Sequence, residues 1–384
     1  MSFSSFSFPT TTLFGAGALA ELPARLAQMQ VHRPLVVTDP GLLQTEAFQI
    51  LQQTLGPSRL NQSWFLHHGV HPNPIEADVS ETAEAFRVGQ CDAVIAFGGG
   101  SALDVGKAAR LLLKRPGLKL AGFRFEEDWS GLAPFIAIPT TAGTGSEVGR
   151  SSVITLKATQ RKAVLFHPEL LARLVILDAE LTRTLPPKLT AATGIDALTH
   201  CLESFTSPVF HPFCDGIALE GIHLIVEALP RAFRHGHDLD ARGRMLVAAA
   251  MGAVAFQKDL GATHSLAHPL STLCGLHHGT ANALCLPAVM KFNAQRKPGL
   301  YRRVGLACGL DVVRCGEREA DVRSLEFIEK LMTEVGLNQR LADYGVQESQ
   351  IEALAEQAIQ DACHQTNPVP VTKEDLKALY QAAL

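Results

Sequence analysis

Four histidines lie close together in the stretch from Thr263 to His278, which reads THSLAHPLSTLCGLHH. His264 and His268 are four residues apart, and His277 directly precedes His278. Imidazole titrates near neutral pH and is the commonest side-chain ligand for transition metals in proteins. The stretch therefore favours metal binding or acid–base chemistry.

A second pair of candidate ligands lies upstream, in the stretch GIDALTHCLES (194–204). Asp196 and His200 are four residues apart, a spacing that places both on one face of a helix. Together with two of the four downstream histidines, they would form a shell of one carboxylate and three imidazoles, which suits Fe(II) or Zn(II). The spacing leaves open which two histidines take part. The HExxH pattern is absent, so nothing supports a zincin protease.

A glycine-rich loop indicates a second kind of site. In AFGGGSALDVGKA (96–108), Gly98, Gly99 and Gly100 directly follow a predicted strand and precede a predicted helix. Backbone amides at such a loop, together with the helix N-terminus, can bind a pyrophosphate. The loop departs from both GxGxxG and the Walker pattern. A plain tight turn therefore remains the alternative.

Two further features of the sequence support the binding of a dinucleotide. The stretch IPTTAGTGSEVGR (138–150) follows another predicted strand and carries the hydroxyls of Thr140, Thr141 and Thr144. Ligands of open α/β sheets bind at the carboxyl ends of such strands. Asp39 is the last residue of the strand predicted over 34–39. Its carboxylate could accept a hydrogen bond from a ribose hydroxyl and would repel a 2′-phosphate. This carboxylate therefore favours NAD over NADP. A helix N-cap is the alternative role of Asp39.

The elements that must position these residues differ between the two halves of the chain. The first half alternates β-branched runs with amphipathic segments, which predicts a parallel sheet covered by helices on both faces. The predicted strands are 34–39, 63–68, 92–97, 134–139, 152–156 and 174–178, and the predicted helices are 41–55, 74–88 and 102–113.

The second half has helical periodicity and no convincing strand. The predicted helices are 188–206, 212–233, 240–256, 279–293, 320–335, 347–361 and 373–383. Pro186 and Pro187 interrupt regular structure between the two halves. The sequence thus predicts an α/β domain over 1–185 followed by an all-helical domain over 186–384.

Composition narrows the class of protein. Hydrophobic residues make up 47% of the 384 residues and charged residues 19%, which is typical of a well-packed globular chain. The net charge of −4 and the lack of a basic stripe argue against a nucleic-acid partner. No apolar run is long enough for a membrane span, and the first basic residue is Arg25, which argues against a targeting peptide. The eight cysteines form no CxxC pair, so we expect reduced thiols and a cytoplasmic location.

At these motifs the sequence resembles the iron-containing alcohol dehydrogenase family, also called group III alcohol dehydrogenases. The matching stretches run in order through the chain: FGGGSALDVGKA, PTTAGTGSEV, GIDALTHCLES, AHPLS and HHGTANALCLP. The resemblance implies a Rossmann-like N-terminal domain and an all-helical C-terminal domain, the architecture of dehydroquinate synthase, with NAD(P) and a divalent metal between them. It also implies a homodimer, while charge and hydropathy argue against a nucleic acid or a membrane as partner.

The resemblance also implies roles for individual residues. The implied metal ligands are Asp196, His200, His264 and His278, with Fe(II) favoured and Zn(II) as the alternative. His268 matches a histidine close to the nicotinamide and the metal, and we expect it to relay the alcohol proton. The implied cofactor contacts are Asp39, Gly98, Gly99, Gly100, Ser101, Asp104, Thr140, Thr141, Thr144 and Lys162. The chain departs from relatives at Ser271, which stands where they commonly have glycine.

The activity expected from these residues is metal-dependent, NAD(P)-linked oxidation of a small primary alcohol, or reduction of the aldehyde, with hydride passing between the alcohol carbon and nicotinamide C4. One alternative is a metal- and NAD-dependent lyase or synthase resembling dehydroquinate synthase. Its acidic substrates would require Lys or Arg near the metal, and residues 194–204 and 261–282 contain neither. The other is an enzyme similar to maleylacetate reductases, which generally lack the four metal ligands.

Overall fold

The computed structural model describes residues 10–56, 64–159 and 161–384. These residues form two compact units. The first contains the described part of Phe8–Leu185 together with Gly236–Leu246, and the second contains Pro186–His235 and Val247–Leu384. The short segment Gly236–Leu246 thus groups with the first unit although it follows residue 186.

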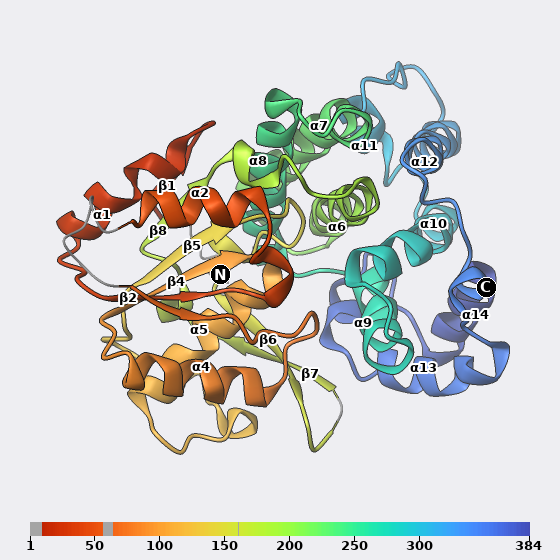
Figure 1. Ribbon diagram of the computed structural model, residues 1–384. Coiled ribbons are helices and arrows are strands. Elements are labelled where there is room, and N and C mark those ends of the chain that lie inside the picture. The colour runs from red at the N-terminus through yellow and green to blue at the C-terminus, as the bar shows by residue number, and fades with distance from the viewer. Residues whose placement is uncertain (1–9, 57–63, 160) are drawn as a thin grey trace. The chain divides into compact units, whose positions relative to one another are not determined.

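The first unit is built on a parallel six-stranded sheet with the order β1-β8-β5-β4-β2-β3 (Figure 1). Its strands are β1 (Thr12–Phe14), β2 (Pro34–Val37), β3 (Phe65–His67), β4 (Ala93–Gly98), β5 (Phe135–Pro139) and β8 (Leu174–Leu177). The predicted parallel sheet is confirmed. Ser63, the first residue of the strand predicted over 63–68, lies outside the described residues.

Helices cover both faces of this sheet, as the continuous apolar runs of its strands require. The helices are α1 (Leu22–Gln28), α2 (Glu46–Thr54), α4 (Glu76–Val88) and α5 (Gly100–Lys114). Figure 1 shows α1 and α2 on one side of the sheet and α4 and α5 on the other. Alternate residues of β4 follow this division: Ile95 and Phe97 pack in a core with Phe48 and Leu51 of α2.

One predicted strand pairs differently from the expectation. Residues 152–156 lie in β6 (Ser151–Leu156), which forms an antiparallel hairpin with β7 (Arg161–Phe166) outside the main sheet. Strand β7 was not predicted; three of its six side chains are exposed and only one is buried. A short β-branched run predicts an extended backbone in either setting, because the partner strand is a tertiary choice.

The second unit is helical, as predicted. Its helices are α6 (Pro187–Thr206), α7 (Pro212–Arg234), α9 (Ala262–Cys274), α10 (His278–Arg296), α11 (Arg302–Ala307), α12 (Glu317–Glu334), α13 (Ile351–Ala358) and α14 (Lys373–Ala383), and it includes the later part of α8 (Leu239–Ala255). Helix α6 packs against α7 and α10, and α10 packs against α9.

In the described chain no single helix has the length and apolarity of a membrane span; Leu239–Lys258 and Ala262–Cys274 meet that test only as a sharply bent pair.

Helix α9 carries the central histidines and was not among the predicted helices. Pro269 lies inside it, and an internal proline removes a backbone donor and argues against a helix. Gly275 ends the helix in the left-handed region, with φ +70°, and the N–H of Leu276 then donates to the carbonyl of Leu270. This tight ending lets α10 begin three residues later, at His278.

Candidate metal and cofactor sites

Asp196 and His200 lie on one face of α6, as their spacing predicts. The helix begins at Pro187, where the missing N–H of proline costs no hydrogen bond, and it is buried over most of its length. Both side chains are buried, and Oδ1 of Asp196 lies 4.0 Å from Nε2 of His200. One turn of helix thus presents an oxygen and a nitrogen donor to the same point.

Two of the four downstream histidines approach the same carboxylate. Nε2 of His264, on α9, lies 4.0 Å from Oδ1 of Asp196, and Nε2 of His278, the first residue of α10, lies 3.6 Å from it. His277 is exposed, and its backbone caps the start of α10. The structure therefore brings together all four residues that were expected to bind the metal.

The distances from Asp196 to the three histidines fit ligands of a single divalent ion. Metal–ligand bonds to imidazole nitrogen and carboxylate oxygen are about 2.0–2.2 Å long, so two donors on one ion lie no more than about 4.4 Å apart. The distances of 3.6–4.0 Å from Asp196 Oδ1 respect that limit. The candidate ligand atoms of Asp196, His200 and His264 also lie within 4.8 Å of one another. A shell of one carboxylate and three imidazoles suits Fe(II) or Zn(II).

Gly279 allows α10 to reach this position. A Cβ added at Gly279 would lie 2.2 Å from the carbonyl oxygen of Ala192 and 3.3 Å from Cβ of Asp196. Only glycine therefore permits the first turn of α10 to contact α6 so closely. The HHG sequence thus combines a candidate ligand with the residue that brings it to Asp196.

Asn282 was missed by the sequence analysis. Its side chain is fully buried, and its Nδ2 donates to Oδ1 of Asp196 at 2.6 Å. The same Nδ2 lies 3.2 Å from Nε2 of His264 and 3.3 Å from Nε2 of His278. Oδ1 of Asn282 has no hydrogen-bond partner among the described residues, and an orphaned buried oxygen beside four convergent donors fits a site that holds a further group. The available signal was its position four residues after His278.

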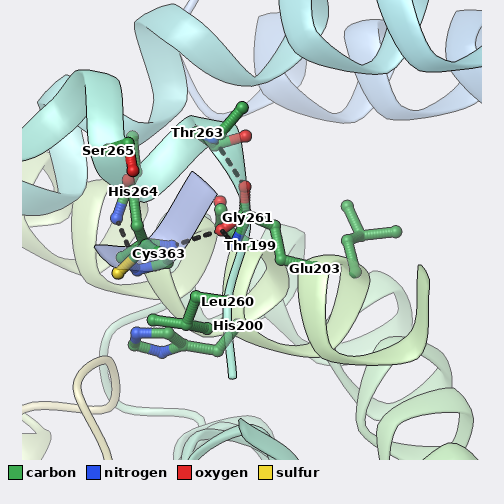
Figure 2. Close-up of polar contacts among 12 residues, drawn as sticks. Thr199, His200, Glu203, Leu260, Gly261, Thr263, His264, Ser265 and Cys363 are labelled. Atoms are coloured by element: carbon green, nitrogen blue, oxygen red, sulfur yellow. Dashed lines mark hydrogen bonds and ion pairs between the residues drawn. The ribbon is translucent and has the colours of Figure 1, made fainter. Parts of the chain in front are cut away.

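Glu203 was also missed, although it lies seven residues after Asp196 and so shares the face of α6 that carries the candidate ligands. It is 5% exposed, and its Oε2 lies 2.6 Å from Nδ1 of His264 (Figure 2). Burial alone would raise the pKa of Glu203, but the hydrogen bonds from His264 and Thr263 outweigh burial and lower it. A carboxylate on Nδ1 orients the imidazole of a metal-ligating histidine.

His268 lies beside the candidate ligands without joining the four. Its ring stacks on that of His278, with 5.3 Å between centroids, and its Nδ1 lies 2.7 Å from Oδ2 of Asp361. Burial would raise the pKa of Asp361, but the hydrogen bond from His268 and the Cys363 N–H lower it below its ordinary value. Asp361 was not predicted as part of the site, and it lies 93 residues from His268 along the chain.

The candidate cofactor residues lie at carboxyl ends of adjacent strands in the first unit. The chain passes from β2 to β3 at the sheet edge and then returns to β4 on the other side of β2. Such a reversal opens a crevice at the carboxyl ends of the two strands. Asp39 follows β2 and Gly98 ends β4, so both lie at this reversal, while Thr140 follows the neighbouring β5.

The glycine loop is shaped for close approach of backbone to a ligand. Gly98 has φ +154°, and a Cβ added at Gly100 would lie 2.7 Å from Cγ2 of Thr144. Gly99, the N-cap of α5, has no side chain to cap the helix, and a Cβ there would lie 3.5 Å from Oγ1 of Thr141. The loop therefore presents the uncapped N-terminus of a 15-residue helix, which fits the pyrophosphate of a dinucleotide.

The carboxylate of Asp39 caps a short helix and also faces the glycine loop. Its Oδ1 accepts from the N–H of Gly41 at 2.9 Å, so it caps the short helix Pro40–Leu42. Burial raises its pKa, and the backbone hydrogen bond of Gly41 opposes that shift. Its Oδ2 lies 3.6 Å from where a Cβ on Gly98 would stand, so the carboxylate also faces the glycine loop.

The remaining expected cofactor residues have contacts within the protein. Asp104 accepts from Oγ of Ser146 at 2.5 Å and from the N–H of Val153 at 3.0 Å, and it thereby ties the loop after β5 and strand β6 to α5. The hydroxyl of Ser101 donates to a backbone carbonyl at 2.5 Å. Lys162 lies on the hairpin strand β7, opposite Thr155. The structure thus gives Asp104 a visible role in shaping the loop.

Comparison with known proteins matches both halves of the chain. Residues 9–179 match the family described as "Iron-containing alcohol dehydrogenase", and residues 190–384 match "Fe-containing alcohol dehydrogenase family, C-terminal".

Three relatives and one solved structure illustrate the match. The chain is 36% identical to alcohol dehydrogenase 4 of Schizosaccharomyces pombe over 387 residues, covering 100% of this chain and 90% of that protein. It is 36% identical to 4-hydroxybutyrate dehydrogenase of Cupriavidus necator, covering 96% of each. It is 32% identical to NAD-dependent methanol dehydrogenase of Bacillus methanolicus, covering 99% of this chain and 100% of that protein. Among solved structures, a 1,3-propanediol oxidoreductase is 31% identical, with a TM-score of 0.95 over 100% of both chains.

Proposed function

Because this chain belongs to the iron-containing alcohol dehydrogenase family, we propose that Asp196, His200, His264 and His278 hold its divalent metal. The enzyme is an NAD-linked, metal-dependent alcohol dehydrogenase. One observation carries the ligand assignment: Oδ1 of Asp196 lies within 4.0 Å of Nε2 of each of the three histidines. We propose Fe(II) as the metal, with Zn(II) as the alternative.

The bound metal supplies Lewis-acid polarisation of the alcohol oxygen, and NAD supplies the hydride acceptor. The chain's own residues orient these groups and move the proton. We propose that His268 accepts the alcohol proton, since Asp361 holds its Nδ1 and its ring lies against that of His278. The carboxylate of Asp196 also accepts from Asn282, which fixes its orientation toward the three histidines.

We propose that the cofactor contacts are Asp39, Gly98, Gly99, Gly100, Ser101, Asp104, Thr140, Thr141, Thr144 and Lys162. The uncapped start of α5 would hold the pyrophosphate, and Asp39 would accept from the ribose and repel a 2′-phosphate, which favours NAD over NADP. Asp104 acts in this proposal by holding the loop that carries Thr144, through its bonds to Ser146 and Val153.

We propose a small primary alcohol or its aldehyde as substrate. Residues 194–204 and 261–282, which carry the candidate ligands, contain no Lys or Arg to bind an acidic substrate. The relative named for methanol supports a small primary alcohol. The same lack of basic residues disfavours a lyase or synthase with acidic substrates.

The domain boundaries, the cellular location and the oligomeric state of the enzyme are also proposals. We propose a Rossmann-like domain over 1–185 and a metal-binding helical domain over 186–384, with Gly236–Leu246 grouping with the first. We also propose a cytoplasmic homodimer with no nucleic acid or membrane as partner. None of the eight cysteines forms a disulfide, which fits a reducing compartment.

The test is a panel of alcohols and aldehydes with NAD(H) and the metal-free protein reloaded with Fe(II) or Zn(II). We expect NADH to form with a small primary alcohol only after reloading. The variant Asp196→Ala should lose metal binding and turnover but bind NAD as the wild type does. Full activity of that variant without metal would refute the ligand assignment.

A further inference from the structure

Three donors converge on the carboxylate of Glu203, which the reaction itself does not use. Oε2 accepts from the N–H of Gly261 at 3.0 Å and lies 2.6 Å from Nδ1 of His264, and Oε1 accepts from the N–H of Thr263 at 2.6 Å. Figure 2 shows Glu203 reaching these groups from α6. The carboxylate is buried, so the three contacts are its main compensation for lost hydration.

The backbone donors belong to the start of α9. The first N–H groups of a helix have no partner within the helix, and Glu203 takes those of Gly261 and Thr263 while Oδ1 of Asn367 takes that of Ala262 at 3.2 Å. A Cβ added at Gly261 would lie 2.8 Å from Oε1 of Glu203, so the helix start is shaped around this carboxylate. Glu203 and Asn367 thus share the capping of α9, but only Glu203 also contacts His264.

The contact on Nδ1 determines what His264 can do at Nε2. A carboxylate that accepts from Nδ1–H leaves the lone pair of the neutral ring on Nε2, the atom that lies 4.0 Å from Oδ1 of Asp196. The same carboxylate holds the ring parallel to that of His200, with 4.7 Å between centroids. The face of α6 that supplies Asp196 and His200 therefore also sets the orientation of a donor on α9.

We infer that Glu203 is a positioning residue for the metal site: it fixes the tautomer and orientation of His264 and thereby sets the affinity for a divalent ion. The inference rests on the proposed function, which makes His264 a ligand. It assigns Glu203 a role beyond capping α9, because its Oε2 also lies 2.6 Å from Nδ1 of His264.

A carboxylate is required at this position because of the number of donors. Glutamine has a single acceptor oxygen, so Glu203→Gln would direct its NH₂ group at either Thr263 or the pair Gly261 and His264. Glu203→Asp keeps the negative charge and both carboxylate oxygens, but its side chain is one methylene shorter, so the oxygens lie farther from His264 and the start of α9. Asn367→Ala is the control, since it removes an acceptor from the same helix start, together with the bonds of Asn367 to Asn293 and Val369, and leaves the contact of Glu203 to His264 in place.

The experiment measures the binding of Zn(II), and separately of Co(II), to metal-free full-length wild type and the three variants. We expect Glu203→Gln to bind either ion about 10–100-fold more weakly than the wild type, with Glu203→Asp between them. The visible spectrum of bound Co(II) should change in Glu203→Gln. Asn367→Ala should keep wild-type affinity and spectrum, although its thermal stability falls. NAD binding and circular dichroism report whether each variant is folded.

Each outcome has a distinct meaning. Wild-type affinity in folded Glu203→Gln would overturn the inference, and so would an equal loss of affinity in Asn367→Ala. A wild type that binds no metal would instead overturn the proposed function. If Glu203→Gln does not fold, ¹⁵N NMR of histidine-labelled, metal-free wild type decides at a pH where the ring of His264 is neutral: a proton on Nδ1 supports the inference, and a proton on Nε2 in place of Nδ1 overturns it.

Discussion

Nδ1 of His268 lies 2.7 Å from Oδ2 of Asp361, and the ring of His268 stacks on that of the candidate ligand His278. Asp361 is itself held by Oγ of Ser265 at 3.1 Å and by the N–H of Cys363 at 2.9 Å. A carboxylate fixed in this way favours the tautomer of His268 whose Nε2 carries the lone pair. The arrangement fits the proposal that His268 accepts a proton beside the candidate metal site.

Replacing His268 with glutamine should separate proton transfer from metal binding. We expect kcat to fall by about 10²–10⁴-fold, the usual contribution of a positioned acid–base group, while the affinity for Zn(II) stays that of the wild type. Steady-state NADH formation and metal titration measure the two quantities. A parallel loss of metal would show that His268 is a ligand, and unchanged kcat would exclude it from the reaction.

Replacing Asp39 with glycine should relax the choice of cofactor. Loss of the carboxylate removes repulsion of a 2′-phosphate, and like charges brought together cost several kcal/mol. We expect the ratio of kcat/KM for NADP to that for NAD to rise by at least about tenfold, which corresponds to about 1.4 kcal/mol. Loss of the cap on Pro40–Leu42 should cost only a few tenths of a kcal/mol, because glycine is tolerated at N-caps. An unchanged ratio would contradict the role assigned to Asp39.

Replacing Gly279 with alanine should disturb both stability and the site. The added Cβ would lie 2.2 Å from the carbonyl oxygen of Ala192, so α10 must move away from α6 and carry His278 with it. We expect a loss of about 1–3 kcal/mol of stability and weaker metal binding. Gly216→Ala on α7 is the control: nothing lies within 4 Å of its Cβ, and helix propensity predicts a gain of up to about 1 kcal/mol. Equal effects of the two changes would contradict the steric argument.

Glu147 should make stability depend on pH. Burial raises the pKa of Glu147 to about 7 from the ordinary 4.5, against the lowering effects of its backbone hydrogen bond and Lys107. The folded state then holds a proton that the unfolded chain has lost, so the free energy of unfolding falls as pH rises from 4.5 to about 7. The fall should total about 3 kcal/mol at about 1.4 kcal/mol per pKa unit.

The variant Glu147→Gln tests this slope. Glutamine keeps the shape of the side chain and does not titrate, so the variant should gain stability relative to the wild type across that pH window. Urea unfolding of both proteins at several pH values measures the difference, in which the contributions of other groups cancel. Parallel pH profiles would show that Glu147 does not titrate in this range.

Local patterns in the sequence predicted much of this protein. Alternating β-branched and amphipathic runs predicted the parallel sheet, and helical periodicity predicted most helices of the second unit. The four-residue spacing of Asp196 and His200 placed both on one face of α6. These features depend on backbone geometry within a few residues. The order of side chains along the chain specifies that local geometry directly.

Only the tertiary structure showed which distant groups meet. Glu203 contacts His264 across 61 residues, Asn282 contacts Asp196 across 86, and Asp361 contacts His268 across 93. A local window shows at most that Glu203 and Asn282 share a helix face with a candidate ligand, and it does not show which distant group each of them contacts. The placement of 152–156 in a separate hairpin was decided in the same way. The sequence by itself determined most helices and strands and the residue types of a candidate metal site. The close packing of α6, α9 and α10 decided which side chains share that site. The reason is that hydrogen bonds form only where the packed backbones bring donors and acceptors together.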